Sequence, residues 1–176
     1  MKRRFLILAV ISLLVFLQTG FVAPLFGADR GPDIVLMFAM AAARVLGFEA
    51  SLGWSVVAGL VYDTATFSKI GFHVLPLIAS IYLVSFFSRR LVADAQAGGI
   101  LLMAGWALAA TLLLRFSHAL YWQKEGIAIV DAVKQAFSMQ ALFSQWFANF
   151  AAMVLGIWII RALKRRFAPT AGLVLK

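Results

Sequence analysis

The sequence contains no cysteine, only two histidines and only seven acidic residues in 176 positions. Without cysteine there can be no disulfide, iron–sulfur cluster or thiolate zinc site. His73 and His118 are too few to form a histidine-based metal cluster. Charged residues make up 13% of the chain and hydrophobic residues 64%, whereas soluble domains average about 25% and about 45–50%. The chain is therefore predicted to be an integral membrane protein.

Catalytic motifs are missing as well. The sequence has no H-E-x-x-H, no G-x-S-x-G and no phosphate-binding glycine loop. Asp63 lies well inside an apolar segment, but a single carboxylate does not form a catalytic dyad. We therefore predict that the protein is not an enzyme and has no catalytic, cofactor-binding or metal-binding residues.

Basic residues outnumber acidic residues by 16 to 7, which gives a net charge of +9. They gather at three places, each beside an apolar segment: Lys2-Arg3-Arg4, Arg89-Arg90 and residues 161–166. This distribution is typical of cytoplasmic loops under the positive-inside rule. It explains the charge without nucleic-acid binding, which we do not expect.

Six apolar segments predict an all-α integral membrane protein with six transmembrane helices in a single domain, residues 1–176. The predicted spans are residues 5–22, 34–48, 50–67, 71–87, 98–117 and 141–160. The first is expected to be a retained helix, because it is longer than the apolar core of a signal peptide and no clear cleavage site follows. Counting the short second segment as a span places all basic groups on one side, so both termini are predicted to be cytoplasmic.

Two connecting segments have informative sequences. Residues 23–33 contain two prolines, two glycines and two aspartates, which predict a loop. Residues 124–140 place Val130, Val133 and Phe137 on one helical face. This pattern predicts either a short amphipathic helix at the outer membrane surface or an ordinary loop helix without a partner.

The third apolar segment carries small and polar residues at every fourth position: Ser51, Ser55, Gly59 and Asp63. They form one helical ridge, along which another backbone can approach closely. An ionisable residue within a span costs roughly 2.5–3.5 kcal/mol at the bilayer centre, so Asp63 is expected to have a partner. The favoured partner is Arg115, with His73 and His118 at a similar level. The alternatives are a contact with another protein or a polar ligand pocket.

Two other polar residues lie within predicted spans. Arg44 is near the cytoplasmic end of the second span, where its long side chain can reach the surface. Asn149 is inside the sixth span, where an amide is expected to bond a neighbouring helix.

The segment GLVYDTATFSKIGFHVLPLIASIYLV, residues 59–84, resembles the family of the rod shape-determining protein MreD. The resemblance consists of G-x-x-x-D at the end of a small-residue span, Gly71 at the start of the next span and Tyr82 deeper within it. PDIVLM, residues 32–37, resembles the start of that family's second helix. Asn149 falls where such proteins tend to carry an asparagine.

This resemblance implies a non-catalytic scaffold in the bacterial inner membrane, which supports lateral peptidoglycan synthesis by the elongation (cell-shape) machinery. It also implies direct contact with MreC and membership of a wider complex with MreB, RodA and penicillin-binding protein 2. Membrane lipid is a further expected contact.

Proteins of the MreD family are similar in architecture to the substrate-binding subunits of energy-coupling-factor vitamin transporters. Such a subunit is therefore the alternative function. Ala39 and Ala43 form an A-x-x-x-A pattern in the second span, whereas those subunits resemble one another in carrying it in the first. The first span here has bulky residues beside Ala9, which favours the scaffold.

Overall fold

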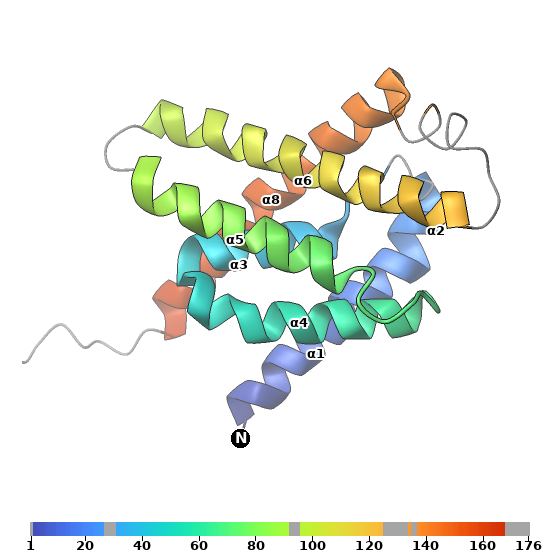
Figure 1. Ribbon diagram of the computed structural model, residues 1–176. Coiled ribbons are helices and arrows are strands. Elements are labelled where there is room, and N and C mark those ends of the chain that lie inside the picture. The colour runs from blue at the N-terminus through green and yellow to red at the C-terminus, as the bar shows by residue number, and fades with distance from the viewer. Residues whose placement is uncertain (1, 27–30, 92–95, 125–133, 135–136, 168–176) are drawn as a thin grey trace, which may run out of the picture.

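The computed structural model describes residues 2–26, 31–91, 96–124, 134 and 137–167, and these residues form helices and short connections without a strand among them (Figure 1). The predicted all-α class is confirmed for this part of the chain. The elements are α1 (Lys2–Leu17), η1 (Gln18–Val22), α2 (Ala23–Phe26), α3 (Ile34–Leu46), α4 (Phe48–Ala65), α5 (Val74–Leu91), α6 (Gln96–Lys124) and α8 (Met139–Phe167). Most of the predicted amphipathic segment, residues 124–140, lies outside the described residues.

The first helical stretch is longer than the sequence predicted. α1, η1 and α2 follow one another without a break, so residues 23–26 are helical and the loop predicted from residue 23 begins later. η1 is a π-helical turn that ends two residues before Pro24. Proline has no N–H to donate, and a local change of hydrogen-bond pattern lets a helix continue past it.

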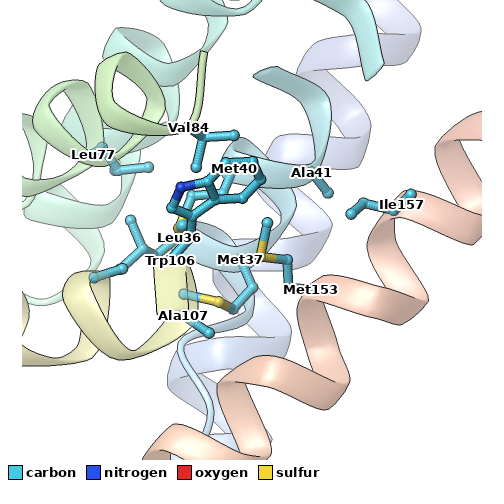
Figure 2. Close-up of a cluster of buried hydrophobic side chains, with 11 residues drawn as sticks. Leu36, Met37, Met40, Ala41, Leu77, Val84, Trp106, Ala107, Met153 and Ile157 are labelled. Carbon is cyan, nitrogen blue, oxygen red and sulfur yellow. The ribbon is translucent and has the colours of Figure 1, made fainter. Parts of the chain in front are cut away.

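Helix α3 is the centre of the molecule. It contacts α1, α4, α5 and α8, and six of its 13 residues are buried. Figure 2 shows Met37 and Met40 among side chains from the surrounding helices. The core cluster around them comprises Leu36, Ala41, Leu77, Val84, Trp106, Ala107, Ala110, Met153 and Ile157. A helix covered on so many sides needs apolar residues all round, which the sequence IVLMFAMAAARVL provides as far as Arg44 in its last turn.

In the described part of the chain, three helices are long and apolar enough to cross a membrane: Phe5–Phe26, Gly99–Ala119 and Met139–Arg165. Two further apolar helices, Ile34–Leu46 and Val74–Ser88, are shorter. At about 1.5 Å per residue, α3 extends for only about 20 Å, against a hydrocarbon core of about 30 Å. The count of six spans therefore stays a prediction.

Helices α4 and α5 pack side by side and run in opposite directions. At one end, Gly59 of α4 lies against Val74, the first residue of α5. At the other end, the rings of Phe48 and Tyr82 meet edge to face with centroids 5.9 Å apart. The connection between the two helices carries Asp63's partners, and these form the first part of the candidate site.

Candidate functional site

Asp63 is completely buried beneath the turn that joins α4 to α5. The Gly71 N–H donates to its Oδ2 at 2.6 Å, and the His73 N–H donates to its Oδ1 at 2.8 Å. His73 Nδ1 lies 2.8 Å from the same Oδ1. The Asp63 side chain thus ties the start of α5 to the end of α4.

The turn has the backbone conformation that this arrangement requires. Gly71 has φ of +97°, which glycine adopts without the steric cost that other residues incur. The Ser68 N–H donates to the Asp63 carbonyl at 2.9 Å. The His73 ring stacks on Tyr62 with centroids 4.1 Å apart. Gly71, one of the residues behind the family resemblance, therefore lets the chain fold back over the carboxylate.

Arg115 does not have the role that the sequence suggested. Among the described residues, the side-chain contact of Asp63 is with His73 Nδ1, and Arg115 Nε donates to Gln145 Oε1 at 2.7 Å. The hypothesis of an Asp63–Arg115 pair is corrected accordingly. It rested on the depth of each residue in its span, whereas Asp63 is two residues from the end of α4 and the returning chain supplies nearer donors.

Arg115 and Asn149 belong to polar contacts between α6 and α8. Arg115 pairs with Gln145, and one helical turn away Asn149 Nδ2 donates to Thr111 Oγ1 at 2.8 Å. All four side chains are buried. Buried polar groups need hydrogen-bond partners, and polar side chains across membrane helices hold the helices in register.

Asn149 also reaches the start of α3, which begins inside the molecule. Its Oδ1 accepts from the Asp33 N–H at 2.7 Å. Asp33 is the N-cap residue, and its Oδ1 accepts from the Leu36 N–H at 2.9 Å. Gln18 Oε1 accepts from the Ile34 N–H at 2.9 Å. The first N–H groups of a helix have no acceptor within the helix. Here the acceptors are side-chain oxygens from η1, from the N-cap of α3 and from α8.

Gln18, Asp33, Thr111 and Gln145 were not among the residues singled out from the sequence. Asp33 had a usable signal, since an aspartate directly before an apolar helical run is an N-cap signature. Gln18 and Thr111 are polar residues within apolar segments, which favours a contact between helices. The partner of each residue could not be found without the packing of the helices.

The predicted ridge of α4 is buried along its length: Ser51, Ser55, Gly59 and Asp63. A Cβ on Gly59 would come within 2.8 Å of Val74 Cα, so α5 approaches the backbone of α4 at this point. Ser51 Oγ donates to the Gly47 carbonyl at 2.8 Å within its own chain segment. His118 stacks on Phe72, with centroids 5.4 Å apart, beside the turn.

The space between the Asp63 turn and the buried start of α3 is small. A cavity of about 10 Å³ is lined by Asp33, Leu36, Tyr62, His73, Pro76, Leu77 and Leu114. A water molecule needs about 10–15 Å³ on the same measure, whereas small-molecule sites typically occupy about 300–1,000 Å³. This cavity cannot hold a vitamin or a cell-wall precursor.

These features define an all-helical membrane protein whose buried polar groups join its helices to one another. The family model described as rod shape-determining protein MreD matches residues 1–166 of the chain. The protein belongs to the MreD family and has a role in determining rod shape. This is a family of shape-determining structural proteins rather than of enzymes. No curated protein and no solved structure matches the chain significantly.

Proposed function

We propose that this protein is a non-catalytic scaffold of the bacterial inner membrane, which supports lateral peptidoglycan synthesis by the elongation machinery. In this proposal it binds MreC directly and acts in a wider complex with MreB, RodA and penicillin-binding protein 2. It crosses the membrane six times and both termini are cytoplasmic. The family match over residues 1–166 supports the cell-shape role, and the basic residues beside the spans support the orientation.

The observation that carries the scaffold role is the use of the buried polar groups. The carboxylates of Asp63 and Asp33 accept hydrogen bonds from the backbone at the start of α5 and α3, and Asn149 joins α3, α6 and α8. Groups that are committed to holding helices together are not available for a reaction. The result is a fixed arrangement of helices, which suits a protein that positions partners.

Depletion of the protein in a rod-shaped host tests the function. We expect the cells to become round while vitamin uptake is unchanged, because the scaffold is needed for elongation and not for transport. A plasmid copy of the wild-type gene should restore the rods. Rod-shaped cells with impaired vitamin uptake would instead favour the transporter subunit.

Copurification tests the proposed partner. The tagged protein, extracted in mild detergent, is expected to retain MreC, whereas an unrelated tagged inner-membrane protein at the same level should not. Loss of MreC from a preparation in which the protein is folded would contradict direct binding.

A further inference from the structure

Basic side chains converge at the end of the molecule opposite the Asp63 turn. Arg44 is in the last turn of α3, and Arg161 and Lys164 are on α8. The positive charges of Arg44 and Arg161 act on each other unfavourably, and Arg161 shares a face of α8 with Lys164, three residues further on. Lys164 Nζ lies 3.4 Å from the Val45 carbonyl at the end of α3. Three cationic groups from two helices therefore face the same small region.

The packing of α3 against α8 fixes this arrangement. The two helices run in the same direction, since Asp33 contacts Asn149 near their starts and Val45 contacts Lys164 near their ends. Between these points, a Cβ on Gly156 would lie 3.1 Å from Ala41 Cβ. The close approach of the backbones leaves little freedom for Arg44 and Arg161 to separate by a shift of the helices.

The described residues supply little negative charge at this place. The carbonyl end of α3 is equivalent to roughly half a negative charge, against three positive side chains. Of the described acidic residues, Asp33 and Asp63 are at the opposite end of the helices and are bonded there. Glu49 is exposed in the first turn of α4 and forms no ion pair within 4.0 Å with any described residue. Arg44 is also partly shielded from solvent, which makes uncompensated repulsion more costly than on an open surface.

We propose that Arg44, Arg161 and Lys164 form a binding site for the phosphate of an anionic phospholipid headgroup. A phosphate oxygen pair matches the planar fork of a guanidinium, and one phosphate between the two arginines replaces their repulsion with two attractions. In the proposed six-span arrangement, the site lies where α3 ends and beside the last turns of α8, near the level of the lipid headgroups. Basic pockets between helices at this level are suited to anionic lipids.

The test uses the purified full-length protein in nanodiscs of phosphatidylcholine, with or without phosphatidylglycerol, and compares Tm in the two bilayers. We expect phosphatidylglycerol to raise the Tm of the wild type. Arg44→Gln and Arg161→Gln should lose most of that rise, and Lys164→Gln part of it. In phosphatidylcholine alone, Arg44→Gln should be at least as stable as the wild type, because its repulsion with Arg161 is gone.

Lys69→Gln is the matched control, since it removes one positive charge at an exposed position at the other end of α3, α4 and α5. It should keep the full rise in Tm. Equal loss in Lys69→Gln would show a general effect of surface charge and overturn the proposal, as would no rise in the wild type. An equal rise caused by inorganic phosphate in phosphatidylcholine nanodiscs would overturn the lipid as the source of the anion.

If Arg44→Gln fails to fold, the loss of the Tm rise in the exposed Arg161→Gln variant tests the proposal by itself. MreC is absent from these samples, so the result is independent of the proposed scaffold role.

Discussion

At the scale of single residues, Asp63 gives the sharpest prediction. Asp63→Asn keeps the size of the side chain, but its NH₂ must face either the Gly71 N–H or the His73 N–H. Either orientation leaves a buried donor without an acceptor, which costs about 1–3 kcal/mol. We expect a clearly lower Tm in detergent. Glu49→Gln, at an exposed position, should stay within about 0.5 kcal/mol of the wild type.

The corrected partner of Asp63 can be tested in the same assay. If His73 and the turn hold the carboxylate, Asp63→Arg combined with Arg115→Asp should not recover stability, because Arg115 bonds Gln145. Recovery of the wild-type Tm by this double substitution would restore the Asp63–Arg115 pair.

At the scale of elements, the α4–α5 contact predicts that replacing two glycines of α4 with alanine will have different effects on stability. Gly59→Ala places a methyl group 2.8 Å from Val74 Cα, so α5 must move, at a typical cost of about 1–3 kcal/mol. Gly53→Ala meets no atom within 4 Å and should be neutral or stabilising by up to about 1 kcal/mol, because alanine favours the helix. Thermal unfolding of the two variants measures the contrast. Equal stability of the two would mean that α4 and α5 are not in contact at Gly59.

The buried start of α3 gives a second prediction for an element. Asn149→Leu removes the acceptor of the Asp33 N–H and the donor to Thr111, at an expected cost of about 1–3 kcal/mol for the buried groups left unpaired. Gln140→Leu, an exposed change on the same helix, should have little effect. A wild-type Tm for Asn149→Leu would show that water or another group replaces the amide.

The positions of the long apolar helices could be predicted from the sequence, and the bonds between them could not. Hydropathy depends on side chains summed along a window, so it identified the regions of α6 and α8. It contains no information on backbone hydrogen-bond donors, so it could not predict that Asp33 is buried or that its N–H donates to Asn149. The ridge from Ser51 to Asp63 follows from helical periodicity. The partner of Asp63 depends on a turn whose path Gly71 determines, and periodicity says nothing about that path.

At the scale of the whole molecule, the absence of cysteine allows a direct test of topology. Lys69→Cys and Lys164→Cys each introduce a single thiol at an exposed position. In the proposed six-span arrangement three spans separate these residues, so they lie on opposite sides of the membrane. A membrane-impermeant maleimide should label Lys69→Cys in intact spheroplasts, and Lys164→Cys only after the membrane is opened. Labelling of both from the outside would contradict the proposed orientation.

The bond between Asp33 and Asn149 also has a consequence for the synthesis of the protein. Its two residues are 116 positions apart, which at about 5–20 residues per second means a delay of roughly 6–23 seconds between their translation. During this time Gln18 and the Asp33 carboxylate can already bind the first turn of α3, because they are local. The Asp33 N–H must wait for the last helix. A nascent chain without α8 therefore presents an α3 whose Asp33 N–H lacks its acceptor to the cell's insertion and quality-control machinery. Only the finished chain supplies that acceptor.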